Sequence, residues 1–250
     1  MLNHPLFLFF PSVLMLWLAE QVGIFWRKRR PLKDEERDDF SVVQAATLTL
    51  LGLILGFSFS MAISRYDMRK NYEEAEANAI GTEYVRAGLL SPNEASTVRG
   101  QLQKYLDLRI LFYRTRDQHE LQGVNAQTAQ LQTQMWSTVQ TPALAQPTPV
   151  MALVVSGMND VLNSQGYTQA AWWNRIPVSA WGLMVAIAIC CNILVGYGAR
   201  SVKIKPTLLL VLPVIVSISF LLIADIDNPR GGMIHVAPQN LASLYQSVHN

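Results

Sequence analysis

The chain has 250 residues, half of them hydrophobic, and its 20 Lys and Arg against 18 Asp and Glu leave a formal net charge of +2. So small a net charge gives no electrostatic reason to expect a nucleic acid as a partner. The two cysteines, Cys190 and Cys191, are adjacent, which predicts neither a disulfide nor a cysteine metal site. This composition suits a membrane domain combined with one modest polar domain.

Four apolar runs predict four transmembrane helices. In chain order they cover residues 5–26, 41–64, 176–199 and 206–224. Each is close to the roughly 20 residues that a helix needs to cross a hydrocarbon core about 30 Å thick. Because lipid offers the backbone no hydrogen-bond partner, each run is expected to be helical. We therefore predict an all-α integral membrane protein.

Basic residues in the short loops predict the orientation. The loop 27–40 holds six, and the loop 200–205 holds three; these are Arg27, Lys28, Arg29, Arg30, Lys33, Arg37, Arg200, Lys203 and Lys205. Such loops stay in the cytoplasm, so the segment between the second and third helices is expected in the periplasm of a bacterium with these helices in its inner membrane. Three basic residues just after the second membrane run favour the opposite orientation; they are Arg65, Arg69 and Lys70. No basic residue precedes the first run, which predicts a retained helix rather than a signal peptide.

Residues 65–175 predict a helical extramembrane domain, followed by the last two membrane helices at 176–224 and a C-terminal tail at 225–250. Residues 1–64 form the first two membrane helices and their basic loop. No proline interrupts residues 40–88, so the second membrane helix is expected to continue into this domain. Ser91-Pro92 with Glu94 predicts the start of the next helix, at about 92–121.

One arginine interrupts an otherwise apolar stripe of that next helix. The stripe consists of Val98, Leu102, Tyr105, Arg109 and Phe112. A guanidinium on a packed face needs a carboxylate partner, and Glu76 and Glu83 are the candidates by position; the alternative is that Arg109 extends to the rim. The candidate polar network consists of six residues: Arg65, Glu76, Asn78, Glu83, Arg86 and Arg109. Its role is either structural or functional.

No pattern in the chain predicts catalysis. The four histidines are scattered, and the sequence carries no glycine-rich phosphate loop, nucleophile elbow or cysteine-pair zinc motif. We therefore expect no enzyme and no cofactor.

The second membrane run carries the first candidate site. Gly52 and Gly56 form a small-xxx-small pattern that lets another helix approach closely, within one protomer or between protomers. Phe57-Ser58-Phe59-Ser60 follows directly. In a ring of such helices, phenylalanines or serine hydroxyls would face an axis, where apolar rings gate a pore by dewetting; plain packing against lipid is the alternative.

An acidic turn follows the fourth membrane run. Asp225, Asp227 and Asn228 precede Pro229-Arg230-Gly231-Gly232. Two carboxylates and an amide supply the oxygen ligands that a cation such as Ca²⁺ prefers. The same residues also fit a capped turn, or an ion pair with Arg65 or Arg69.

Several motifs, in order, resemble the bestrophin-like family of bacterial membrane proteins. Leu55 to Ser60 running into Arg65-Tyr66 and Arg69 is similar to its second-helix signature. The remaining motifs are Glu76 to Thr82 with Arg86, then Leu102 with Tyr105, Asp107 and Arg109, and finally Asp225 to Gly232. The resemblance covers nearly the whole chain from Ser41 onward.

The resemblance implies a helical membrane protein that is at most distantly related to bestrophins, which are pentameric anion channels. By position, Phe57 and Phe59 would be similar to the apolar constriction of their pore, and Asp225 and Asp227 to their calcium-binding segment. The acidic run here is sparser than in bestrophins. Bestrophins keep the helical domain in the cytoplasm, which is opposite to the orientation that the basic loops predict.

Two functions follow from the sequence. The first is a homo-oligomeric channel, an anion channel by this resemblance, with its pore lined by the second helix and with membrane lipid and further copies of the chain as partners. The alternative is a non-conducting membrane scaffold or sensor whose helical domain binds a partner or ligand.

Overall fold

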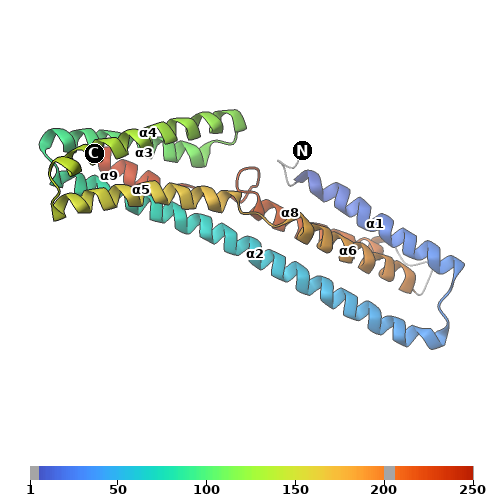
Figure 1. Cartoon of the computed structure of the whole chain (residues 1–250). Helices are drawn as coiled ribbons and strands as arrows, with labels where there is room; N and C mark the ends of the chain where they lie inside the picture. Colours follow the sequence, from blue (N-terminus) through green and yellow to red (C-terminus); the bar gives the residue numbers. More distant parts are fainter. Residues whose placement is uncertain (1–5, 200–205, 250) are drawn as a thin grey trace. The chain divides into compact units, whose positions relative to one another are not determined.

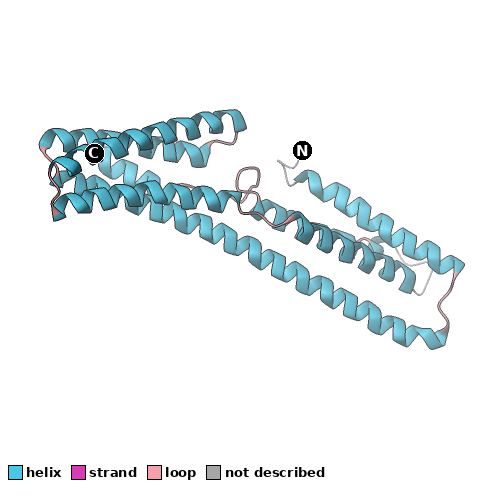
Figure 2. Ribbon diagram, viewed as in Figure 1, coloured by secondary structure: helices cyan, strands magenta, loops and turns pink. Residues whose placement is uncertain are grey.

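The computed structural model describes residues 6–199 and 206–249, and within these ranges it contains helices and loops but no strand (Figures 1 and 2). The α-helices are α1 (Leu6–Arg29), α2 (Arg37–Arg86), α3 (Pro92–Arg114), α4 (Gln118–Ala145), α5 (Pro149–Trp173), α6 (Val178–Gly198), α7 (Pro206–Leu209), α8 (Val211–Asp227) and α9 (Gln239–His249). Short 3₁₀ turns, Asp34–Glu36 and Ala87–Leu89, flank α2. The predicted all-α fold is confirmed.

Among the described residues, four helical stretches are long and apolar enough to cross a membrane. They are Leu8–Arg29, Asp34–Leu89, Pro149–Gly198 and Thr207–Asp227. Each overlaps one of the four predicted membrane helices, and the fold class with four such helices is confirmed. The basic loop predicted at 200–205 and the first residue of the run at 5–26 lie outside the described residues.

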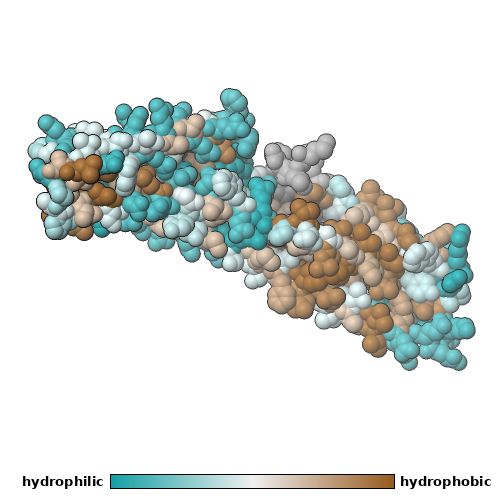
Figure 3. All heavy atoms as spheres, viewed as in Figure 1, coloured by the Kyte–Doolittle hydropathy of each residue, from teal (hydrophilic) through white to brown (hydrophobic). Residues whose placement is uncertain are grey.

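The chain divides into two compact units. The first comprises Met1–Arg65 and Arg175–Ile234, and the second comprises Tyr66–Asn174 and His235–Asn250. The sequence placed all of 225–250 in a separate tail, whereas α9 belongs to the second unit and packs on α3. Hydrophobic residues gather over α1, α6 and α8, and hydrophilic residues over α3, α4 and α5 (Figure 3).

Glycines allow α1 and α6 to approach closely in the first unit. A Cβ atom added to Gly23 would overlap the backbone of Ile193, and one added to Gly196 would overlap the backbone of Glu20. Only glycine permits such an approach, because any larger residue would push the two helices apart. This small-residue contact lies in α1 and α6, whereas the sequence analysis drew attention to the glycines of α2.

Two helix boundaries differ from the sequence prediction, each for a local reason. The fourth apolar run is divided at Leu210 into α7 and α8, because Pro213 has no N–H to donate to the carbonyl of Leu209. The helix predicted at 92–121 ends at Arg114. The side chain of Asp117 then accepts the N–H of Glu120 at 2.8 Å and begins α4 as an N-cap.

A single hydrophobic core holds the second unit together. The predicted stripe of α3 is buried as expected: Val98, Leu102, Tyr105, Arg109 and Phe112 are all completely inaccessible to solvent. Helices α4 and α5 add further residues to this core, among them Leu121, Val124, Leu131, Met135, Val139, Val154, Met158 and Val161. The start of α3 carries the predicted capping box, since the backbone N–H of Ser91 donates to Glu94 at 3.2 Å.

Candidate functional site

The glycine pair of α2 is uncovered within the protomer. No heavy atom of the described residues lies within 4 Å of a Cβ added to Gly52 or Gly56. The buried side of this part of α2 carries Leu51, Ser58 and Ala62 instead. Within the described part of the protomer, the small-residue surface therefore forms no helix contact, and it is open to lipid or to another copy of the chain.

The four residues after Gly56 point in different directions. Phe57 is 64 % exposed, Phe59 is 38 % exposed and Ser60 is exposed, whereas Ser58 is only 6 % exposed. Phe57 and Phe59 are two residues apart and thus about 200° apart around the helix, so only one of them can face a common axis. Ser58 faces the interior of its own protomer, which separates it from the other predicted pore-lining residues.

The acidic residues at the end of α8 form a closed turn. Asp225 accepts the N–H groups of Met233 at 2.7 Å and Ile234 at 2.8 Å, and Asn228 accepts the N–H of Gly231 at 3.2 Å. A Cβ added to Gly232 would meet the carbonyl oxygen of Asp225, so the turn requires glycine there. The Asp225 carboxylate therefore accepts two backbone N–H groups, as in the capped-turn reading of the sequence.

Asp227 joins three segments of the first unit. Its carboxylate accepts the backbone N–H of Ile176 at 3.0 and 3.1 Å and forms an ion pair with Arg65 at 3.3 Å. This is the ion pair that the sequence offered as an alternative to a cation site. Among the described residues, no group of three or more His, Cys, Asp or Glu side chains is arranged to hold a metal ion.

A completely buried ion pair lies in the second unit. Arg109 of α3 donates to Glu76 of α2 through Nε and, at 3.4 Å, through Nη2. The carboxylate also accepts the hydroxyl groups of Thr168 at 3.1 Å and Tyr113 at 3.4 Å. The guanidinium carbon lies 4.3 Å from the centre of the Phe112 ring. Of the two carboxylates that the sequence suggested, Arg109 therefore pairs with Glu76.

The pair perturbs the titration of its neighbours. Burial raises the pKa of the Tyr113 hydroxyl, and the Glu76 carboxylate raises it further. Burial alone would lower the pKa of Arg109, but the nearby Glu76 charge raises it above its ordinary value. Arg109 therefore remains protonated, and the pair ties α2 to α3 and, through Thr168, to α5.

The other predicted network residues lie apart from this pair. Glu83 is buried, and neither of its carboxylate oxygens has a hydrogen-bond partner among the residues that the structure describes. Burial, opposed by Arg86 and reinforced by Asp160, raises its pKa to about 8. Arg86 donates to the carbonyl of Leu153 at 3.4 Å, and Asn78 is exposed. Since Arg65 pairs with Asp227 in the first unit, the six residues do not form one network.

Two further buried charges of α2 were not predicted as site residues. Arg69 donates to the carbonyls of Ala171 at 3.3 Å and Asn174 at 3.4 Å, at the C-terminal end of α5. Glu73 accepts the N–H of Leu241 at 2.9 Å, near the N-terminus of α9. Each charge has the sign that stabilises the helix end it contacts. Arg69 also belongs to the second-helix motif that resembles the family, whereas Glu73 was signalled only by its spacing with Glu76; the partners of both are distant along the chain.

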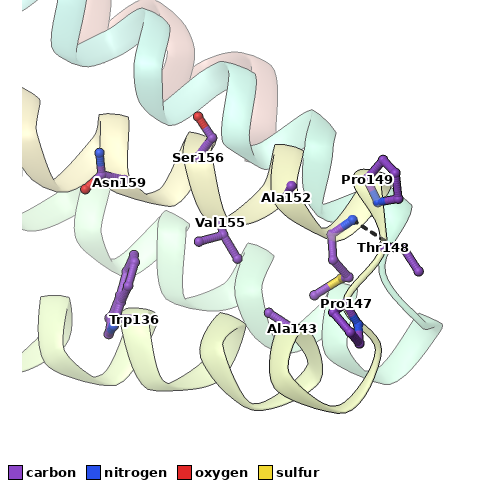
Figure 4. Close-up of a pocket in the computed structure, with 10 residues that line it drawn as sticks. Trp136, Ala143, Pro147, Thr148, Pro149, Ala152, Val155, Ser156 and Asn159 are labelled. Atoms are coloured by element: carbon purple, nitrogen blue, oxygen red, sulfur yellow. Dashed lines mark hydrogen bonds between the residues drawn. The ribbon is translucent and has the colours of Figure 1, made fainter.

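A largely apolar pocket of about 740 Å³ lies between α4 and α5, near their connection (Figure 4). Trp136 of α4 and Val155 of α5 point toward the space between the two helices, and Pro147 and Pro149 close its end. None of the described residues that line it is charged. The pocket therefore has the character of an apolar binding surface, without groups for acid–base chemistry.

Comparisons with known proteins identify the fold. The crystal structure of a point mutant of a bacterial bestrophin homologue from Klebsiella pneumoniae superposes with a TM-score of 0.68 at 13 % identity, covering 98 % of this chain and 99 % of that one. A second crystal structure of a bestrophin homologue from this bacterium, phased with zinc, gives a TM-score of 0.67 at 13 % identity, with 97 % and 96 % covered. A search among curated proteins gives no match.

The family follows from the sequence itself. The model of the bestrophin-like domain matches residues 15–241, which is most of the chain. The resemblance carried by the motifs of α2, α3 and α8 is therefore confirmed. This chain is a membrane protein with the fold of the bacterial bestrophin homologues, and it belongs to the Bestrophin-like family.

Proposed function

We propose that this protein is a homo-oligomeric membrane channel, conducting anions, with α2 lining the pore. The observation that carries the proposal is the uncovered apolar face of α2 at Gly52, Gly56 and Phe57. Membership of the bestrophin-like family supports the channel, and the resemblance to bestrophins supports anion conduction and a pentamer.

The small residues of α2 supply the contacts between copies. Gly52 and Gly56 allow a neighbouring helix to approach within the membrane. Ala75 and Thr82 are exposed farther along the same helix, and Ala79 is half-buried. Uncovered small residues along both parts of α2 fit a ring of long helices packed side by side.

Phe57 supplies the constriction. It is the more exposed of the two phenylalanines and lies about 100° from Gly56 around the helix. If Gly52 and Gly56 face a neighbouring copy, Phe57 turns toward the axis of the ring. A ring of phenylalanines narrows a pore and excludes water from it, which sets a barrier to ions.

Chloride flux from liposomes containing the purified protein tests this proposal. We expect flux above that of empty liposomes, and a severalfold increase for Phe57→Ala, because the smaller side chain opens the constriction. Phe10→Ala is the matched control, since Phe10 is 75 % exposed on α1. Phe59→Ala tests the other face of α2 and is expected to leave the flux unchanged.

Each alternative has its own outcome. Equal flux for Phe57→Ala and the native protein would place the barrier elsewhere. An increase for Phe59→Ala alone would turn the other face of α2 to the axis. No flux in any of these proteins would favour the membrane scaffold, for which the pocket between α4 and α5 supplies an apolar binding surface.

For the location we propose a bacterial inner membrane, with the basic loop 27–40 in the cytoplasm and the helical domain in the periplasm. The six basic residues of this loop support that orientation, because short basic loops resist translocation. The opposite orientation is the one that the resemblance to bestrophins implies.

A further inference from the structure

A second pocket, of about 370 Å³, has a different character from the one between α4 and α5. It lies in the second unit, where the end of α3 meets the chain leading into α9. Its lining contains the basic residues Arg114, Arg116 and His235. The polar residue Gln239 and several largely apolar residues complete the lining; the latter are Tyr113, Val236, Ala237, Pro238 and Ala242.

The two arginines are available to a ligand. Both are exposed, and no ion pair joins either of them to a carboxylate among the described residues. The nearest acid along the chain is Asp117, whose carboxylate accepts the N–H of Glu120 as the N-cap of α4. Two unpaired guanidinium groups around one cavity concentrate positive charge there.

The buried acids near this pocket already have partners. Glu76 pairs with Arg109, and Glu73 accepts the side-chain amide of Asn240 at 2.6 Å and the N–H of Leu241 at 2.9 Å. Glu73 thus occupies donors near the N-terminus of α9, so the pocket depends on side-chain cations rather than on this helix end. Neither buried acid remains free to neutralise Arg114 or Arg116.

We propose that this pocket binds a phosphate group through Arg114 and Arg116. Guanidinium groups match the oxygen geometry of phosphate and donate two hydrogen bonds each, which makes arginine well suited to bind it. The apolar part of the wall accommodates the carbon atoms that such a phosphate carries. An anionic phospholipid headgroup and a soluble phosphate share this chemistry.

The test measures binding to the full-length protein in a neutral detergent, at fixed chloride concentration. The probes are short-chain phosphatidylglycerol, short-chain phosphatidylcholine and inorganic phosphate. We expect phosphatidylglycerol to bind saturably and to bind at least tenfold more weakly to Arg114→Gln/Arg116→Gln. The matched control, Lys70→Gln/Lys104→Gln, removes the same charge from exposed positions outside the pocket and is expected to bind like the native protein.

A second variant, Ala242→Leu, narrows the pocket without changing its charge and is expected to weaken binding as well. Saturable binding of inorganic phosphate with the same dependence on both arginines would identify a soluble phosphate as the ligand. Equal binding by the arginine variant and its lysine control, or no binding of any probe, would overturn the proposal. Neither result depends on ion conduction.

Discussion

Charged residues form the buried face of the second half of α2. Arg69, Glu73, Glu76 and Glu83 are each at most 1 % exposed, and Ile80 is 2 % exposed. Their spacing of three and four residues places them on one side of the helix. Three of the charges contact a partner of opposite sign or a helix end, whereas Glu83 has no hydrogen-bond partner among the described residues. The stability of the second unit therefore depends on how these buried charges are paired, and removing each charge has a different effect on that stability.

Arg109→Met is expected to destabilise the second unit by about 3–5 kcal/mol, because the substitution leaves the Glu76 carboxylate buried without its cation. Thermal unfolding followed by tryptophan fluorescence measures this, since Trp172 packs on Phe112 and Tyr113. Arg109→Met/Glu76→Met is expected to recover part of the loss, because it leaves no unpaired charge. A double variant as unstable as the sum of the single variants would contradict this account; Lys104→Met serves as the exposed control.

Glu83 makes the stability of the second unit depend on pH. Its pKa is about 8 in the folded protein against an ordinary value of 4.5, so the folded state binds the proton more tightly than the unfolded state. The contribution of Glu83 to stability is then fully present below about pH 4.5 and is lost as the pH rises toward about 8. The fall occurs because the unfolded chain releases the proton first.

Glu83→Gln is expected to stabilise the protein at pH 8 to 9 by about 1–3 kcal/mol, because the neutral amide removes the charge that burial penalises in this range of pH. The variant should also unfold with a weaker dependence on pH between 5 and 9. Thermal unfolding across this range provides the measurement, with Glu74→Gln, an exposed position on the same helix, as the control. Identical pH profiles for Glu83→Gln and the native protein would show that Glu83 does not carry the effect.

At the level of helices, the membrane glycines fall into two groups. Gly23 and Gly196 allow α1 and α6 to pack closely inside the protomer, whereas a Cβ added to Gly52, Gly56 or Gly182 meets no atom of the described chain within 4 Å. The first group serves the fold of one chain. The second group is available for contacts outside it, and the difference becomes visible only when each glycine is placed against its neighbours.

Gly56→Leu is expected to leave the protomer folded and to weaken its assembly. An added Cβ meets no described atom within 4 Å at this position, whereas the leucine side chain blocks the close approach of a second α2. Light scattering of the detergent-solubilised protein during gel filtration measures the mass of the assembly. Gly182→Leu is the matched control, on α6. Unchanged mass for Gly56→Leu would exclude this face of α2 from the contact between copies.

For the whole molecule, chemical labelling from one side of the membrane tests the proposed orientation. We expect Ser137→Cys, on α4 of the helical domain, to react with a membrane-impermeant maleimide in intact spheroplasts. Glu35→Cys, in the basic loop, is expected to react only after the membrane is permeabilised. Both are made in a chain with Cys190→Ala and Cys191→Ala. The reverse pattern would establish a cytoplasmic helical domain, as the resemblance to bestrophins implies.

The sequence by itself determined the membrane class and the family. Apolar runs of sufficient length must be helical in lipid, so composition and length decide the four membrane helices without any contact between them. The sequence also predicted the buried stripe of α3, because its residues recur at the spacing of three and four that places them on one side of a helix. The order of the motifs in α2, α3 and α8 then carried the family, which the match over residues 15–241 confirmed.

Only the tertiary structure decided which charges pair and which surfaces are open. Glu76 meets Thr168 from 92 positions farther along the chain, and Asp227 meets Arg65 from 162 positions away. The same holds for Arg114 and His235, which line one pocket from distant parts of the sequence. Local periodicity shows the side of a helix on which a residue lies. The hydrogen-bond or ion-pair partner of that residue depends on how distant segments pack, because two groups can interact only where the fold brings them together.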